Sequence, residues 1–167
     1  MNIPYQNLGG IRVGPSKISE IARGAMRIEE KGFRFYSAMA GMTEDERIRQ
    51  IFIKLADEEK EHLKVFEKLL VCYDHDEFLE PEVADYLNAL MQENLFPVDV
   101  KPGQPNRKVE TMKDALAIGV QAEKDAILLY HELLSRTRSE HGRKLLYSLI
   151  EEEKMHLMEL RSYYEEI

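Results

Sequence analysis

Apolar residues near the C-terminus recur at steps of three and four, the spacing that puts side chains on one face of an α-helix. This face carries Leu145, Leu146, Leu149, Leu157 and Leu160. Glu153 and His156 fall on the same face. A carboxylate and an imidazole therefore point toward the predicted core, where each needs a partner to offset its lost hydration.

Capping signals and helix breakers indicate a first pair of long helices. One begins at Ser16 or Ser19 and runs to about residue 40, since serine is a favoured N-terminal cap. The next begins at the capping box Thr43-x-x-Glu46 and runs to about residue 73. Only a short segment separates them, which predicts an antiparallel helical hairpin.

A second pair of long helices follows a long connector. Thr111-x-x-Asp114 resembles another cap and opens a helix that runs to about residue 136. The last helix starts near Thr137-x-x-Glu140 and continues almost to residue 167. In the connector, Pro81 precedes a shorter helical segment, EVADYLNALMQENL.

These elements predict an all-α protein with one domain, 1–167. Hairpins 16–73 and 111–167 would form a four-helix bundle, joined by connector 74–110 with its short extra helix. The connector is too long for an ordinary turn, so we expect it to travel along the bundle.

An internal repeat relates the two hairpins. Shifting the sequence by 94 residues aligns, among others, Glu29 with Glu123, Tyr36 with Tyr130, Glu59 with Glu153, and His62 with His156. The glutamates of each hairpin lie 30 residues apart, and the midpoint of each pair falls in a predicted loop. Two glutamates at equal distances from the loop of an antiparallel hairpin lie at the same height along the helices.

The repeat predicts a polar cluster in the core. Each histidine follows a glutamate by three residues and shares its helix face. Four buried carboxylates would repel one another, and two divalent cations would supply the compensating charge. We therefore predict a dinuclear metal site with the ligands Glu29, Glu59, His62, Glu123, Glu153 and His156.

Other polar residues have less specific patterns. Tyr36 and Tyr130 lie two turns after Glu29 and Glu123, so each either packs in the core or hydrogen-bonds a ligand carboxylate and assists catalysis. The remaining glutamates near the motifs are interpreted as solvated charges: Glu30, Glu58, Glu61, Glu151 and Glu152. The remaining histidines are interpreted as surface or loop residues: His75, His131 and His141.

Composition narrows the classes of partner. The formal net charge is −8 and no run of Lys or Arg occurs, which argues against a nucleic-acid partner. Cys72 is the single cysteine, so no internal disulfide or Cys-rich metal site can form. The first fifteen residues do not resemble a signal peptide, and no apolar run reaches membrane-spanning length. We expect a cytoplasmic protein with no membrane partner.

The doubled Glu-x-x-His motif resembles the ferritin-like di-iron carboxylate proteins, which take one Glu from each of two helices and a Glu-x-x-His from each of the other two. Within that superfamily, the segments IEEKGFRFY and ADEEKEHL look most like the rubrerythrin branch. The resemblance implies a long crossover, two Fe ions bridged by Glu59 and Glu153, chemistry with peroxide or O2, and a homodimer.

Two departures from the rubrerythrin pattern are visible. Typical rubrerythrins append a rubredoxin domain that binds iron with two Cys-x-x-Cys pairs. A chain with one cysteine cannot build this domain. Electrons would therefore come from an external donor protein or from substrate iron. Typical rubrerythrins also carry an extra glutamate where this chain has Ala126. Ala126 puts the redox-linked iron movement of those peroxidases in doubt.

The leading hypothesis is a di-iron oxidoreductase, of peroxidase or ferroxidase type. The alternative is a non-catalytic iron-binding or iron-handling module of the same fold, and a third reading is a structural bundle whose acidic core residues have lost their use. Mn or Zn could occupy the site in place of Fe, because carboxylate and imidazole ligands suit all three metals.

Overall fold

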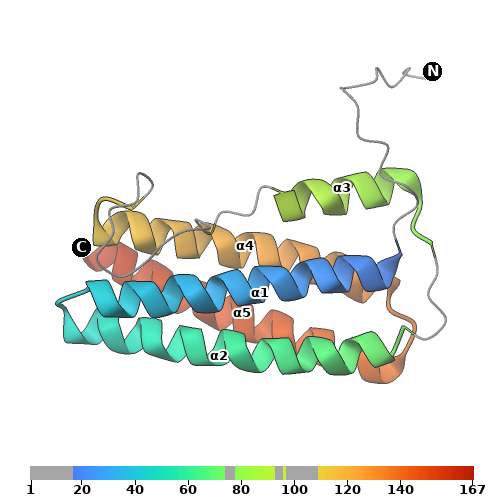
Figure 1. The fold of residues 1–167 in the computed structure, drawn as a ribbon, viewed down its shortest axis with the longest axis horizontal. Coiled ribbons are helices and arrows are strands. Elements are labelled where there is room, and N and C mark those ends of the chain that lie inside the picture. Colours follow the sequence, from blue (N-terminus) through green and yellow to red (C-terminus); the bar gives the residue numbers. More distant parts are fainter. Residues whose placement is uncertain (1–16, 74–77, 93–95, 97–108) are drawn as a thin grey trace, which may run out of the picture.

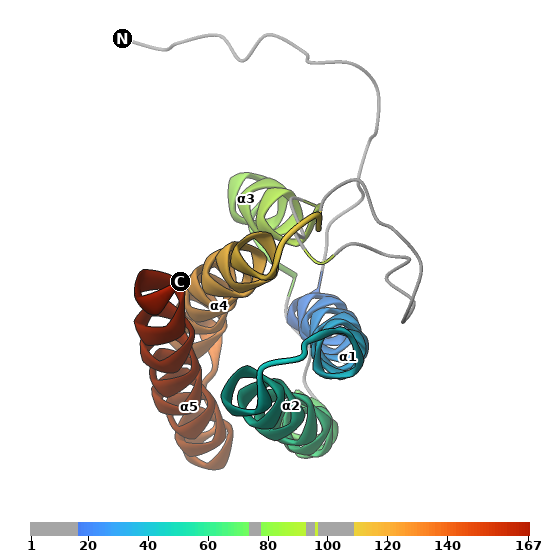
Figure 2. The same ribbon diagram turned by 90° about the vertical axis from the view of Figure 1, so that its left-hand side faces the viewer.

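The computed structural model describes residues 17–73, 78–92, 96 and 109–167. It has four long helices, α1 (Ile18–Met42), α2 (Glu46–Val71), α4 (Met112–Arg136) and α5 (Glu140–Glu166), and the shorter α3 (Pro81–Gln92). Figure 1 shows the long helices side by side, and Figure 2 shows α3 outside the bundle, next to α4. The predicted all-α bundle with a helix in its long crossover is confirmed.

The helices α2 and α5 begin after the threonines near which the sequence predicts their starts. Asp45, not Thr43, caps α2 by accepting from the N–H groups of Arg47 and Ile48. Ser139, not Thr137, caps α5 by accepting from Gly142 N–H. Both predicted threonines instead end the preceding helices, where their N–H groups donate to carbonyls of the last turn.

The start of α4 agrees with the predicted cap, whereas the start of α1 agrees only in part. Thr111 and Asp114 form the predicted reciprocal box at the start of α4. Lys17 precedes α1, and its N–H donates to Glu20 Oε2 at 2.9 Å. Ser19 lies inside the first turn and is not the cap, while Ser16 lies outside the described residues.

The core has two apolar clusters with a polar layer between them. One cluster gathers near the start of α1 and the end of α2, with Phe66 and Leu149 at its centre. The other gathers near the end of α1 and the start of α2, with Phe52 and Leu116. Within the described residues, no helix has both the length and the apolar character needed to cross a bilayer. The cytoplasmic location and the homodimer stay predictions.

Glycine permits one close contact that positions the crossover. A Cβ added to Gly24 in α1 would lie 2.1 Å from Met91 Sδ in α3. The missing side chain therefore lets α3 lie close against the bundle.

Candidate metal centre

The polar layer consists of the six side chains singled out by the repeat. Glu29 comes from α1, Glu59 and His62 from α2, Glu123 from α4, and Glu153 and His156 from α5. All six are buried, with at most 3% of their surface exposed. Each lies between the two apolar clusters, so the helices hold them at one height with bulk water excluded.

Their ligand atoms form two overlapping groups. One contains Glu29, Glu59, His62 and Glu153, and the other contains Glu59, Glu123, Glu153 and His156. Within each group, one nitrogen or oxygen from every side chain lies within 4.8 Å of the others. Glu59 and Glu153 belong to both groups. Each of these two carboxylates could therefore be shared between two ions.

His62 shows the crowding of this layer most directly. Its Nδ1 lies 3.2 Å from Glu29 Oε2, 3.1 Å from Glu59 Oε2 and 3.0 Å from Glu153 Oε1. One ring nitrogen carries at most one proton, so it cannot donate to all three carboxylates. The Glu153 contact lacks hydrogen-bond geometry. Within the part of the chain that the structure describes, Glu153 Oε1 is therefore buried without a hydrogen-bond partner.

Burial and mutual repulsion shift the pKa values of the cluster. Burial, and then the neighbouring carboxylates, raise the pKa of Glu29 and of Glu123 well above their ordinary value. For Glu153, burial acts in the same direction, but the hydrogen bond with His156 and the nearby His62 ring outweigh it and lower the pKa. Burial alone would lower the pKa of both histidines, but the carboxylates around them raise it.

These features fit metal ions. Carboxylate oxygens and imidazole nitrogens converge on shared positions, and a buried carboxylate oxygen there lacks a hydrogen-bond donor. Without metal ions, bound protons and the histidines offset the negative charge of the carboxylates. Cations at these positions would offset that charge instead. Oxygen and nitrogen ligands of this kind suit Fe, Mn and Zn.

Glu58 and Glu152 add an outer layer that the sequence pattern missed. His62 Nε2 lies 3.1 Å from Glu152 Oε2, and His156 Nε2 lies 3.0 Å from Glu58 Oε2. Each histidine is thus held by a carboxylate of the opposite hairpin. Glu58 and Glu152 are partly solvated, as predicted, but each also binds a histidine. The sequence pattern missed these contacts because the partners come from distant segments. A carboxylate on Nε2 fixes the ring and leaves Nδ1 toward the cluster.

The two tyrosines occupy unlike environments. Tyr36 Oη donates to Glu123 Oε1, across from α1 to α4. Gly119 leaves room for this contact, because a Cβ there would lie 3.1 Å from Tyr36 Oη. Tyr130 is fully buried, and its hydroxyl has no hydrogen-bond partner among the described residues. The two tyrosines occupy equivalent positions in the repeat, but only Tyr36 hydrogen-bonds the cluster, whereas Tyr130 packs in the apolar core.

A residue of the crossover covers the cluster on the α1 side. Phe96 is buried and packs on Phe35 and Tyr36, with ring centroids 5.2 and 5.6 Å apart. A Cβ added to Gly32 would meet both the Phe96 ring and the Glu59 carboxylate at 3.3 Å. The aromatic cover therefore lies close to a shared carboxylate.

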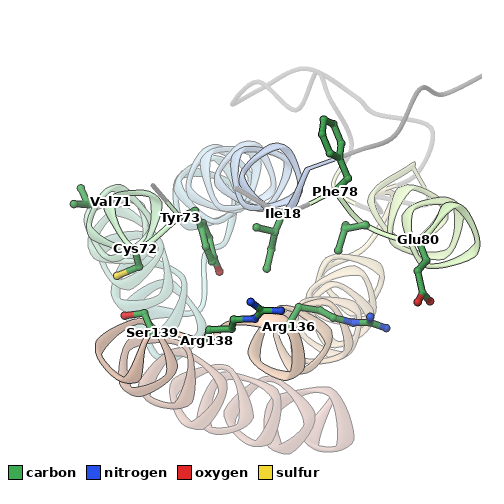
Figure 3. A pocket seen from close by; sticks show the side chains of 10 residues that line it. Ile18, Val71, Cys72, Tyr73, Phe78, Glu80, Arg136, Arg138 and Ser139 are labelled. Carbon is green, nitrogen blue, oxygen red and sulfur yellow. The ribbon is translucent and has the colours of Figure 1, made fainter. Parts of the chain in front are cut away.

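The remaining histidines and the cysteine lie elsewhere. His131 and His141 are exposed, as predicted, and His75 lies outside the described residues. A cavity of about 650 Å³ lies at one end of the bundle. Cys72, Tyr73 and Ser139 are among the side chains that line it (Figure 3). None of the six clustered side chains lines it.

Comparison with known proteins places this geometry in a family. The family model described as rubrerythrin matches residues 20–164. The chain belongs to the rubrerythrin family. A comparison with proteins of curated function finds no match.

Two solved structures share the fold. A protein from Thermotoga maritima, described as a ferritin-like diiron-carboxylate protein, is 28% identical, with a TM-score of 0.68. The match covers 90% of this chain and 96% of that one. A hypothetical protein from Pyrococcus furiosus is 22% identical over 92% of each chain, with a TM-score of 0.65, which shows the fold alone.

Proposed function

We propose that this rubrerythrin-family chain is a dinuclear iron oxidoreductase that reduces peroxide or O2, of peroxidase or ferroxidase type. The observation that carries the proposal is the pair of ligand groups that share Glu59 and Glu153. Glu29 and His62 would complete one metal position, and Glu123 and His156 the other. The T. maritima relative, described as a diiron-carboxylate protein, supports the choice of iron.

A bound pair of iron ions would supply the two electrons that reduce an O–O bond. The chain's own residues prepare the place for that chemistry. Glu152 and Glu58 hold the Nε2 atoms of the two histidines, so each Nδ1 faces the cluster. The apolar clusters keep bulk water away, and Tyr36 Oη holds a proton against Glu123 Oε1.

The first test measures metal content and turnover together. Protein purified without chelator, and protein loaded anaerobically with Fe(II), should contain about two metal ions per chain by elemental analysis. The iron-loaded protein should then consume peroxide faster than free iron does. Loading of one ion or none per chain would contradict the proposal.

A matched pair of variants makes this test specific. Glu59→Ala/Glu153→Ala removes both shared carboxylates and should abolish binding and turnover. Glu61→Ala/Glu151→Ala removes two exposed carboxylates from the same helices and should change neither. Equal losses in the two variants would show that helix charge, not the cluster, holds the metal.

An iron-handling module is the second candidate. Ala126 lies in an apolar cluster and offers no ligand atom, and the lone Cys72 lies at the end of α2, away from the six side chains. Two bound metals without peroxide consumption, together with equal binding of Fe and Zn, would favour this function.

A further inference from the structure

A cationic groove lies on the α1/α2 hairpin. Its rim carries Arg23, Arg27 and Arg34 from α1 and Lys60 from α2, all exposed. Among the described residues that line it, Glu30 is the one carboxylate. Its half-buried apolar floor consists of Met26, Phe33 and Leu63. The groove has a volume of about 500 Å³. Glu30 pairs with Arg34, so the remaining cations of the rim outnumber its carboxylates.

The internal repeat shows that the fold does not require these arginines. The equivalent positions of the second hairpin hold Ala117, Gln121 and Leu128, all exposed. The floor, by contrast, is apolar in both hairpins, with Val120, Ile127 and Leu157 at the matching positions. At the two other rim positions the second hairpin has Lys154, which matches Lys60, and Lys124, which matches Glu30. The first hairpin therefore differs from the second by its three arginines.

The groove lies beside the metal centre. Lys60 directly follows Glu59, and Leu63 directly follows His62. Glu30 directly follows Glu29, and Arg27 lies two residues before it. A helix with its side chains is about 10–12 Å wide, so a molecule bound in the groove would lie about one helix width from the cluster. The path from the groove to the cluster therefore runs through the segments of α1 and α2 that contain the candidate metal ligands.

The proposed reaction consumes electrons. Reduction of H2O2 to two water molecules takes two electrons and two protons, and the chain has no second cysteine to form a redox-active pair with Cys72. The net charge of −8 would repel an acidic protein from most of the surface. The groove, where cations outnumber carboxylates four to one, would attract and orient it.

We propose, resting on the function above, that this groove docks an acidic electron-carrier protein that reduces the metal centre. The apolar floor provides contact area, and the cationic rim selects and orients the carrier. The interaction is transient, because the groove is small and its charges are solvated.

The test uses a flavodoxin of net negative charge as the probe. Its binding to the full-length, iron-loaded protein is measured by fluorescence anisotropy at low salt. Arg23→Glu/Arg27→Glu/Arg34→Glu should raise the Kd about tenfold or more, and added salt should weaken binding by the wild type. Arg23→Gln/Arg27→Gln/Arg34→Gln removes the positive charges without introducing negative ones. It should weaken binding less than the glutamate variant does.

A matched control separates local from global charge. Lys124→Glu/Lys144→Glu/Arg161→Glu changes the net charge equally, but at exposed positions on α4 and α5. Equal loss of binding in the groove and control variants would overturn the proposal, and so would no loss in either. Binding of an oligonucleotide in the groove without binding of flavodoxin would overturn it too.

Electron transfer gives the second readout. Stopped-flow reduction of the oxidised protein by reduced flavodoxin should slow about tenfold or more in the groove variant. Methyl viologen radical cation needs no anionic docking and should reduce all variants at similar rates. Failure of methyl viologen would contradict the redox function itself, whereas reduction by flavodoxin that ignores the three arginines would overturn only the docking surface.

Discussion

Two half-exposed glutamates hold the buried histidines from outside the cluster. The side chains of Glu58 and Glu152 are 37% and 51% exposed, yet each binds a histidine Nε2 of the other hairpin. If metals bind on the Nδ1 side, these contacts fix the ring orientation. Glu58→Gln or Glu152→Gln should therefore lower metal affinity about 10- to 100-fold.

Competition with a chromophoric chelator for Co(II) measures this loss. Glu61→Gln and Glu151→Gln change exposed glutamates that pair with lysines on the same helices, and they should leave affinity within error. If the Glu58 and Glu152 variants bind like these controls, the carboxylates do not orient the histidines.

The pKa shifts of the cluster predict how the stability of the metal-free protein depends on pH. The pKa values of Glu29 and Glu123 lie above their ordinary 4.5, and those of His62 and His156 above 6.5. All four groups bind protons more tightly when folded. Their contribution to stability is present below the ordinary values and is lost as pH rises through the folded ones.

The free energy of unfolding of the metal-free protein should therefore fall between about pH 5 and about pH 8. Glu153 does not reverse this trend, because the stability that its lowered pKa contributes is fully present above the ordinary 4.5 and is lost only below it. Urea titrations across this range measure the trend. Glu29→Gln/Glu123→Gln should flatten it, and Glu30→Gln should not. Stability that increases with pH would contradict the assigned proton positions.

At the scale of single elements, the start of α5 is set by a serine hydroxyl. Ser139 Oγ accepts from Gly142 N–H at 3.2 Å, which satisfies one of the free donors at the helix start. Ser139→Ala should destabilise the protein by about 1 kcal/mol, measured by urea denaturation. Ser135→Ala serves as the control.

Ser135 bonds back to Glu132 O inside α4 and caps no helix. Its replacement by alanine should be neutral or slightly stabilising, because alanine is the better helix former. A Ser139→Ala effect no larger than that of Ser135→Ala would mean that α5 does not depend on this cap.

The starts of α2 and α5 show why helix starts are hard to place from sequence. Thr43 and Thr137 stand three residues before glutamates, as a box requires, but Asp45 and Ser139 stand closer to the helix. Arg49 NH2 donates to Thr43 O at 2.7 Å, and Thr137 Oγ1 donates to Leu133 O. These contacts keep both threonines outside the new helix, and no local motif reveals them.

For the whole molecule, the repeat made the bundle and the level of the cluster predictable. Equal spacing from Glu29 to Glu59 and from Glu123 to Glu153 fixes relative heights on antiparallel helices. The spacing could not predict which glutamate of one hairpin meets which histidine of the other, since that depends on how the hairpins pack. It also could not place Phe96, because the crossover has no repeat partner.

The cluster links the two hairpins, and this predicts how metals affect the whole bundle. Each ligand group takes side chains from three long helices and from both hairpins. An ion in either group would thus bind the folded protein and not the unfolded chain. At a free concentration 100 times the Kd, one such ion stabilises by about 2.7 kcal/mol. For a chain of this length, that is a rise in Tm of about 5–10 °C.

Scanning calorimetry with and without Fe(II) under anaerobic conditions tests this linkage. Glu29→Gln and Glu123→Gln each remove a residue that belongs to one group only, so each should lose about half of the metal-induced rise. Glu59→Gln/Glu153→Gln changes both shared carboxylates and should lose all of it while the metal-free protein still folds. If either single variant loses the whole rise, the two ions do not occupy separate groups, and the repeat has not produced two equivalent metal positions.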